Sequence, residues 1–278
     1  MSEITVRAQH RCHGGQLGFY SHESRETGTT MRFGLFLPPA ASLPPALYYL
    51  AGLECTEETF LIKSGATRLA AELGLALVAP DTSPRGADIA GEEADWDLGT
   101  GAGFYVDATA EPWRRHYRMQ SYVARELPAL IERHFPVRPD RRGIFGHSMG
   151  GHGALVVALL EPERWHSLSA FAPIANPVAV PWGIKAFGAY FGDHPPLWRA
   201  NDASLLMTGR RYPGRILVDQ GLADRFIDSQ LRPQALEDAA RASGQDLTMR
   251  RQEGYDHSYW FIQSFIADHL QWHARDLL

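Results

Sequence analysis

Short runs of hydrophobic residues recur along the chain, and each of them ends in a turn. The runs near Tyr48, Leu77 and Ile144 are almost wholly apolar, which is typical of strands buried on both faces of a parallel sheet. Together with three weaker runs, they predict strands within residues 31–39, 45–52, 73–81, 141–146, 214–221 and 247–254.

Segments of helical length separate these runs, and they predict helices within residues 58–74, 119–135, 232–244 and 258–277. Pro233 near the start of one segment and Gly244 just past its end follow the usual asymmetry of helix termini. Strands that alternate with helices indicate a single α/β domain over residues 1–278, with a mostly parallel central sheet flanked by helices. The hydrophobic pattern of residues 176–198 fits neither the helical nor the strand period well, so we expect this segment to be an excursion over one end of the sheet.

The composition narrows the classes of partner and compartment. The 278 residues are 45% hydrophobic and 21% charged, and the net charge of −5 does not favour a nucleic-acid partner. Two cysteines, Cys12 and Cys55, are too few for a disulfide framework and suit a reducing compartment. No apolar stretch approaches the ~18 residues of a membrane span, and the first residues do not resemble a signal peptide. We therefore expect a cytoplasmic protein with no membrane partner.

One serine stands among four glycines in the segment IFGHSMGGHGALVVALL, which begins at Ile144. Ser148 is the centre of a G-x-S-x-G motif between a predicted strand and an apolar run of helical length. In such a strand-to-helix turn, glycines two positions away remove side chains that would clash. The serine hydroxyl then stands at the end of the sheet and at a helix N-terminus. The pattern predicts that Ser148 is a nucleophile.

A serine nucleophile needs a base, and in this architecture the acid and the histidine follow the serine in the chain. His257 lies in a turn between the last predicted strand and the final helix, where the base is expected. His269 and His273, near the end of that helix, are expected to be solvated. Two aspartates compete as the acid. Asp219 ends a strand, whereas Asp224 lies in the following loop and reaches further toward His257, so Asp224 is preferred.

The tetrahedral intermediate of acyl transfer needs two backbone donors. The amide of Met149, directly after the nucleophile, is the first candidate. The loop AGLECTEETF follows the strand predicted at residues 45–52 and offers Leu53 as the second. Two other patterns do not indicate a binding site. The GTGAGF segment lacks the preceding strand that a nucleotide-binding loop requires, and the histidines and cysteine at residues 10–13 lack a second pair of ligands for zinc.

Several stretches resemble the S-formylglutathione hydrolases, also called the esterase D family, among them AGLECTEETFLIKSG, LVAPDTSPRG, WDLGTGAGFYVDAT, FGHSMGGHGAL, PWGIKAF, VDQGLAD and EGYDHSYWFI. The resemblance runs from about residue 4 to the end and includes loops as well as the serine motif. It implies an α/β-hydrolase fold, hydrolysis of S-formylglutathione to glutathione and formate, no metal, no organic cofactor and a homodimer. The triad it implies is Ser148, Asp224 and His257, the same three residues.

The resemblance also bears on substrate binding. Glutathione carries two carboxylates, so we expect basic side chains near the pocket, with Lys63, Arg85 and Lys185 as the candidates. Cys55 matches a family cysteine in the oxyanion loop, which suggests a position close to the site. Glu54 stands where family members usually have threonine, and its charge is expected to weaken oxyanion binding or to disfavour an anionic substrate.

Aromatic residues from two segments predict a narrow acyl site. Trp182 and Phe187 lie in the excursion, and Phe104 and Tyr105 lie in the segment GAGFYV. We expect their rings beside Ser148, where they would leave room for a formyl or short alkyl group only. Three other functions would use the same residues or fold: a broad short-chain carboxylesterase, an acyltransferase, and a non-catalytic binding module, which the intact triad disfavours.

Overall fold

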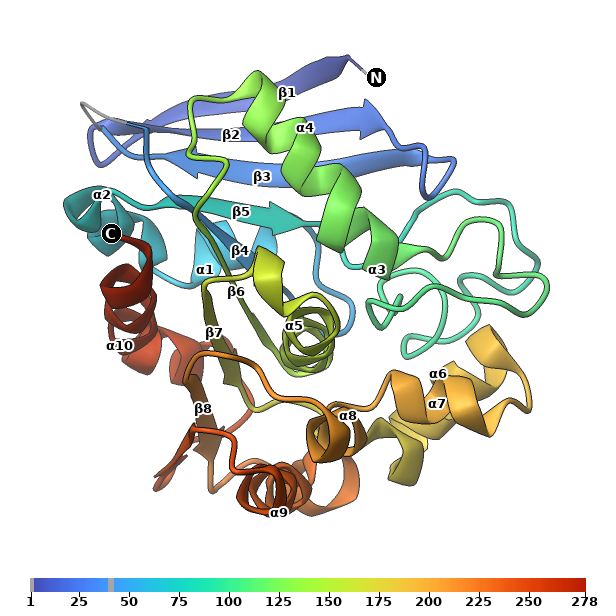
Figure 1. Cartoon of the computed structure of the whole chain (residues 1–278). Helices are drawn as coiled ribbons and strands as arrows, with labels where there is room; N and C mark the ends of the chain where they lie inside the picture. Colours follow the sequence, from blue (N-terminus) through green and yellow to red (C-terminus); the bar gives the residue numbers. More distant parts are fainter. Residues whose placement is uncertain (1–2, 40–42) are drawn as a thin grey trace.

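The computed structural model describes residues 3–39 and 43–278, so residues 1–2 and 40–42 of the predicted domain lie outside the described residues. The described strands form one nine-stranded sheet in the order β1-β2-β3-β5-β4-β6-β7-β8-β9 (Figure 1). They are β1 (Ile4–Cys12), β2 (Gly15–Glu23), β3 (Thr30–Leu37), β4 (Ala46–Leu50), β5 (Ala76–Pro80), β6 (Arg142–His147), β7 (Ser167–Phe171), β8 (Ile216–Gly221) and β9 (Leu247–Gln252).

Helices flank this sheet on both sides. They are α1 (Thr59–Lys63), α2 (Ala66–Leu73), α3 (Met119–Ser121), α4 (Leu127–His134), α5 (Met149–Leu160), α6 (Pro181–Phe191), α7 (Pro195–Ala200), α8 (Ala203–Gly209), α9 (Pro233–Ser243) and α10 (Tyr259–Leu277). Short π-helical segments, η1 (Tyr122–Glu126) and η4 (Ile227–Leu231), and 3₁₀ turns at η2 (Pro162–Arg164) and η3 (Pro177–Ala179) complete them. Helices α2 and α10 pack together on one side of the sheet, whereas α4, α5 and α8 lie on the other (Figure 1).

The strand directions confirm the predicted, mostly parallel α/β sheet. Strands β5, β4, β6, β7, β8 and β9 are parallel to their neighbours in this part of the sheet, whereas β1, β2 and β3 pair antiparallel. The carboxyl ends of the parallel strands therefore meet at one edge, where ligands of open α/β sheets bind. The residues selected from the sequence as catalytic or oxyanion-binding all follow these carboxyl ends: Leu53 after β4, Ser148 and Met149 directly after β6, Asp224 after β8 and His257 after β9.

The first two strands were not predicted from the hydrophobic pattern. Strand β1 lies at the edge of the sheet and most of its side chains are exposed, so it has no hydrophobic run. His13 and Gly14 connect it to β2 with φ values of 46° and 77°, as in a two-residue hairpin turn. The pairing of β1 with β2 shifts register between Val6 and Ala8, which marks a bulge.

Strand β7 was also missed, because serine alternates with hydrophobic residues in its sequence SLSAF. Ser169 Oγ lies 2.8 Å from His269 Nδ1 and 2.8 Å from His273 Nε2, and Ser167 Oγ lies 2.6 Å from His273 Nδ1. Both histidines of α10 are fully buried against the sheet. The prediction that they are solvated was wrong, because the hydroxyls of β7 satisfy their ring nitrogens inside the molecule.

The predicted excursion at residues 176–198 contains two helices, α6 and α7, that the sequence period did not indicate. Gly183 interrupts the helical pattern of α6, yet the packing requires it: a Cβ there would lie 2.1 Å from the Pro177 carbonyl oxygen. The helix predicted over residues 58–74 is divided into α1 and α2 at Gly65, whose φ is 69°.

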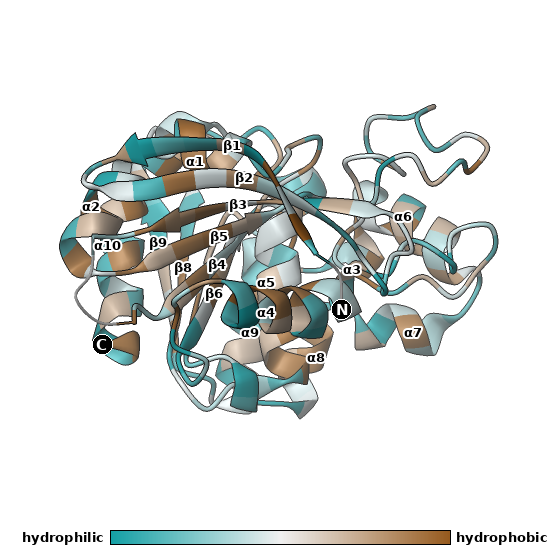
Figure 2. Ribbon diagram, turned by 90° about the horizontal axis from the view of Figure 1, so that it is seen from above, coloured by the Kyte–Doolittle hydropathy of each residue, from teal (hydrophilic) through white to brown (hydrophobic). Residues whose placement is uncertain are grey.

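The hydrophobic interior lies between the sheet and the helices. Figure 2 shows that the central strands are predominantly hydrophobic, whereas hydrophilic positions are frequent in β1. Helix α5 is buried along almost its whole length, as its uniformly apolar sequence predicts. Within the described residues, no helix combines the length and the apolar character that crossing a membrane requires.

Candidate active site

Ser148 lies between the end of β6 and the first residue of α5, and its backbone has φ 58° and ψ −119°. The chain reverses so tightly here that neighbouring positions have no room for side chains. A Cβ on Gly146 would lie 2.3 Å from the Gly150 carbonyl oxygen, and one on Gly150 would lie 1.9 Å from the Leu50 carbonyl oxygen. The turn therefore holds the Ser148 side chain at the carboxyl edge of the sheet, beside the positive end of the α5 dipole.

His257 and Asp224 are joined by a hydrogen bond of 2.5 Å between imidazole Nδ1 and carboxylate Oδ2. Asp224 is buried, and its carboxylate also accepts hydrogen bonds from the Phe226 amide at 2.9 Å and from Gln220 Nε2 at 3.4 Å. A carboxylate on Nδ1 keeps the proton of a neutral imidazole on that nitrogen. His257 Nε2 is then free to accept a proton from Ser148, with which His257 lines one cavity.

Asp219, the competing acid, lies inside β8 rather than at its end, and it faces other partners. Its carboxylate accepts hydrogen bonds from Arg250 Nε at 2.7 Å, Gln252 Nε2 at 3.0 Å and His269 Nε2 at 3.1 Å. Burial by itself would raise the pKa of Asp219, but the hydrogen bonds from His269 and Arg250 lower that pKa to about 2. Asp219 is thus a buried anion that balances Arg250, whereas Asp224 is the aspartate that contacts His257.

The imidazole of His257 packs against two further rings. The ring centroids of His147 and Phe226 lie 4.4 Å and 5.3 Å from that of His257. Burial, with a smaller contribution from the neighbouring His257, lowers the pKa of His147 well below its usual value. His147 therefore stays neutral and adds no positive charge that would oppose an imidazolium on His257.

Two backbone amides are available for an oxyanion. Leu53 lines the same cavity as Ser148. The next two amides are already hydrogen-bonded: that of Glu54 donates to the Gly101 carbonyl at 3.0 Å, and that of Cys55 donates to the Gly52 carbonyl at 3.2 Å. Among residues 3–39 and 43–278, the Leu53 amide has no acceptor. The Met149 amide, at the first position of α5, has no intrahelical partner either.

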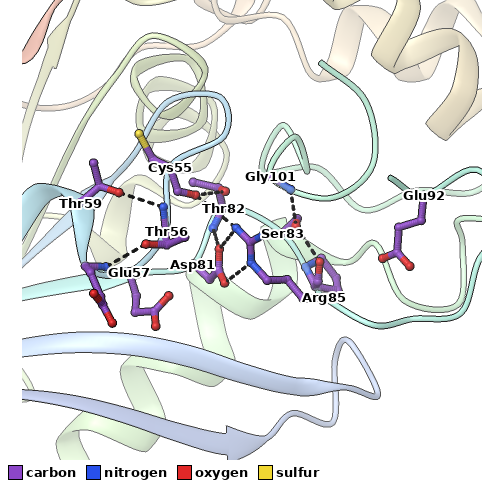
Figure 3. A network of polar contacts seen from close by, with 12 residues as sticks. Cys55, Thr56, Glu57, Thr59, Asp81, Thr82, Ser83, Arg85, Glu92 and Gly101 are labelled. Carbon is purple, nitrogen blue, oxygen red and sulfur yellow. Dashed lines mark hydrogen bonds and ion pairs between the residues drawn. The ribbon is translucent and has the colours of Figure 1, made fainter. Parts of the chain in front are cut away.

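A polar network fixes the backbone of this oxyanion loop from behind (Figure 3). Thr82 Oγ1 donates a hydrogen bond of 2.6 Å to the Cys55 carbonyl. The Gly101 amide donates to Ser83 Oγ at 2.8 Å, which holds the segment that accepts the Glu54 amide. The loop thus has little freedom to move its amides, as preorganised oxyanion binding requires.

A cavity of about 270 Å³ opens beside Ser148. Two larger hollows, of about 670 and 560 Å³, lie elsewhere on the molecule and contain none of the three triad residues, so the smaller cavity is the candidate active site. No group of three potential metal ligands occurs in the part of the chain that the structure describes. The cavity is lined by Gly52, Leu53, Cys55, Trp96, His147, Ser148, Trp182, Arg225, Phe226, His257, Ser258 and Tyr259.

Trp182 is the one predicted acyl-site aromatic that lines this cavity. Its buried ring lies 5.7 Å from that of Trp96 and 4.8 Å from that of Phe226, centroid to centroid. These three rings form one wall of the cavity. A wall of rigid rings limits the size of the acyl group that can lie next to Ser148.

The prediction was wrong for Phe104, Tyr105 and Phe187, which are fully buried and do not line the cavity. The rings of Phe104 and Phe187 instead pack near His152 of α5, at 6.3 Å and 6.1 Å between ring centroids. Tyr105 instead donates its hydroxyl to the Ala51 carbonyl at 2.9 Å, so it supports the oxyanion loop.

The candidates for substrate binding lie in different surroundings. Cys55 lines the cavity, and burial raises the pKa of its thiol. Lys63 is exposed at the end of α1 and does not line the cavity itself. Two candidates are occupied: Lys185 pairs with Asp95 at 3.1 Å and with Asp97, and Arg85 donates to Asp81 at 2.7 and 2.9 Å (Figure 3).

Seven lining residues were not selected from the sequence: Gly52, Trp96, His147, Arg225, Phe226, Ser258 and Tyr259. Five of them lie one or two positions from a triad residue, so adjacency to Ser148, Asp224 or His257 could have indicated them, and Gly52 adjoins the predicted oxyanion donor Leu53. Trp96 has no such signal, because it reaches the site from the long segment between β5 and α3.

Comparison with known proteins agrees with this geometry. A family model described as a putative esterase matches residues 24–272. The chain is 52% identical over 272 residues to an S-formylglutathione hydrolase of Paracoccus denitrificans strain Pd 1222, with 97% of each chain covered, and 51% identical over 276 residues to that of Mus musculus, again with 97% of each covered. A solved S-formylglutathione hydrolase from Agrobacterium tumefaciens superposes with a TM-score of 0.96 at 47% identity, covering 98% of this chain and 99% of that one.

Proposed function

The chain belongs to the S-formylglutathione hydrolases, serine hydrolases with the α/β-hydrolase fold, and on this premise we propose that Ser148, His257 and Asp224 hydrolyse S-formylglutathione to glutathione and formate. The observation that carries the assignment of residues is the hydrogen bond of 2.5 Å between Asp224 and His257 at the cavity into which Ser148 opens. The carboxylate, imidazole and hydroxyl of a catalytic triad require this order.

In the first half of the reaction, His257 Nε2 takes the hydroxyl proton as Ser148 Oγ forms a bond to the formyl carbon. The carbonyl oxygen becomes an oxyanion and accepts hydrogen bonds from the amides of Leu53 and Met149. The carbon–sulfur bond then breaks, and the proton on His257 passes to the sulfur, so that glutathione leaves as a thiol. Asp224 stabilises the imidazolium without taking its proton.

In the second half, water attacks the formyl ester of Ser148, and His257 takes one of its protons. The second oxyanion uses the same two amides, and its collapse breaks the bond between carbon and Ser148 Oγ. His257 returns the proton to Ser148, and formic acid leaves and ionises to formate. No step requires a metal ion or an organic cofactor, and unchanged activity after treatment with a chelator would test that expectation.

The central experiment compares kcat/KM for S-formylglutathione, S-acetylglutathione and short aryl esters, with Ser148→Ala as the control variant. We expect the formyl thioester to be the best substrate, and Ser148→Ala to lose nearly all activity and its reaction with an organophosphate. An enzyme that preferred aryl esters would be a broad short-chain carboxylesterase, and a folded Ser148→Ala protein with full turnover would exclude the triad.

We also expect a cytoplasmic homodimer. A reducing compartment is supported by Cys12 and Cys55, which are both free thiols. The homodimer rests on family resemblance alone. Light scattering of the purified protein would measure the mass of the particle, and a mass near that of one chain, 31.0 kDa, would contradict the dimer.

A further inference from the structure

The substrate proposed above carries carboxylates, and two basic residues selected for them from the sequence are already neutralised. Arg85 donates two hydrogen bonds to Asp81, and Lys185 pairs with two aspartates. A cation that is already paired has little charge left for a ligand, so neither one fits the role. The candidates for binding the substrate carboxylates are therefore the basic residues near the cavity that have no carboxylate partner.

Arg225 is the basic residue that lines the cavity. It is exposed, and its guanidinium carbon lies 4.6 Å from the ring centroid of Phe226, which lines the same cavity. Among residues 3–39 and 43–278, no carboxylate lies within the distance of an ion pair from Arg225. The aromatic ring orients the guanidinium but leaves its N–H donors free, since a ring face offers no hydrogen-bonding lone pairs.

Lys63 is held in the same way at another part of the rim. Its ammonium lies 5.9 Å from the ring centroid of Tyr259, which also lines the cavity. No carboxylate in the described part of the chain pairs with it. The Lys63 carbonyl accepts a hydrogen bond of 2.5 Å from Gln263 Nε2, so the end of α1 is tied to α10 beside the site.

We propose that Arg225 and Lys63 bind the two carboxylates of the glutathione group, one at the Phe226 rim and the other at the Tyr259 rim, while the thioester lies at Ser148. The inference rests on the proposed function. The two cations are unpaired, each is positioned by a ring that lines the same small cavity, and the leaving group carries two anionic ends. Arg225 can form a bidentate pair with a carboxylate, whereas Lys63 acts as a point charge.

Acidic residues close to the rim act against these cations. Glu54 is exposed beside the oxyanion donor Leu53, and its neighbour Cys55 lines the cavity. Asp256 precedes His257 and is also exposed, with its carboxylate bound to the Ser258 hydroxyl at 2.6 Å. Without the two cations, this rim would repel a substrate of net negative charge.

The test compares S-formylglutathione with a neutral formyl thioester, S-formyl-N-acetylcysteamine, in Arg225→Gln, Lys63→Gln and the double variant. Each single substitution should lower the ratio of kcat/KM for the charged over the neutral substrate about tenfold, mainly through KM, which corresponds to about 1.4 kcal/mol for the loss of one charge-assisted contact. The double variant should lose about the product of the two factors. Arg241→Gln, an exposed cation on α9 paired with Asp238 at 3.0 Å, is the charge-matched control and should leave the ratio unchanged.

Glu54→Gln changes the net charge in the opposite direction without touching either cation, so it should raise the ratio. Inhibition by S-methylglutathione separates the two proposals, because it reports binding without turnover. If the wild-type enzyme did not prefer the formyl thioester but Arg225→Gln and Lys63→Gln still weakened inhibition, the carboxylate site would stand and the proposed function would fall. Equal losses on charged and neutral substrates in both variants, with unchanged inhibition, would overturn the carboxylate site.

Discussion

The backbone of Ser148 adopts φ 58° and ψ −119°, which a residue with a side chain rarely adopts. Strain of this kind costs on the order of 1–3 kcal/mol and persists only where the surroundings enforce it. Here they do so through close packing: a Cβ on Gly52 would lie 3.1 Å from the Ser148 Cβ. Alanine at Gly146 or Gly150 would push this turn apart, so the strain and the position of the hydroxyl depend on the same neighbours.

Asp219 in β8 and Asp224 in the loop that follows should respond in different ways to the same substitution. Asp224→Asn should lower kcat by about 10³-fold or more, because an amide no longer selects the productive tautomer of His257. Asp219→Asn should keep most of kcat but lower the free energy of unfolding, since it leaves Arg250 without its buried partner. Steady-state kinetics and urea unfolding of both variants would check this. A mild Asp224→Asn beside a severe kinetic loss in Asp219→Asn would show that the acid is Asp219.

Cys55 should make the enzyme sensitive to thiol reagents although it takes no part in the chemistry. An adduct would occupy much of a cavity of about 270 Å³ and displace the Leu53 amide. Because burial raises the pKa of this thiol, inactivation by iodoacetamide should accelerate with rising pH, later than for an ordinary exposed thiol.

The cysteine variants separate this effect from others. Cys55→Ala should stay active and become resistant. Cys12→Ala should stay sensitive, because Cys12 lies near Thr67, at 3.6 Å from its hydroxyl, and does not line the cavity. A folded but inactive Cys55→Ala protein would mean that the thiol acts directly.

At the scale of elements, the sequence predicted the strands that form hydrophobic runs and missed β1, β2 and β7, which do not. The apolar strands β4, β5 and β6 stand out because hydrophobic side chains cover both of their faces. Strand β7 is as buried as they are, but its serines bind the histidines of α10, and a partner on a distant helix leaves no periodic signal. The pairing of Asp224 with His257 could be predicted from the order of the loops along the chain. The contribution of Trp96 to the cavity wall could not, because it depends on tertiary packing that no local sequence pattern encodes.

Helix α6 should set the preference for acyl size through Trp182. We expect kcat/KM to fall from formyl to acetyl to butyryl thioesters, and Trp182→Ala to raise the butyryl value by about tenfold, since one methylene in a tight pocket changes binding by ~1–3 kcal/mol. Phe187→Ala on the same helix is the control, because Phe187 is buried away from the cavity and should affect stability alone. If Trp182→Ala destabilised the protein but left the order of acyl groups unchanged, the ring would be core packing only.

At the scale of the whole molecule, buried histidines should make stability depend on pH. Burial lowers the pKa of His152 to about 4 and lowers those of His147, His269 and His273 as well. Below about pH 6.5 the unfolded chain binds protons that the folded protein cannot, so stability is full above that pH and falls toward pH 4. For His152 alone, the decrease in the free energy of unfolding approaches about 3 kcal/mol.

Urea unfolding between pH 7 and pH 4.5 would measure this slope. His152→Phe should reduce the dependence of the unfolding free energy on pH by the contribution of about one proton, because it removes one titrating group. The Phe ring can pack against Phe104 and Phe187, which pack near His152. A slope unchanged by the substitution would show that His152 is protonated equally in both states.

The bulge at Val6 and Ala8 has a consequence for the protein at high concentration. A sheet of nine strands has two open edges, and an unguarded edge invites strands of other molecules to add to it and grow into fibrous aggregates. On β1 the bulge breaks the regular ladder, and the exposed Arg11 would place a positive charge beside any incoming strand. On β9 the ion pair between Arg251 and Glu237, at 2.6 Å, places charged side chains near the other edge. These features of the two edge strands disfavour the extension of the sheet from one copy of the molecule to the next.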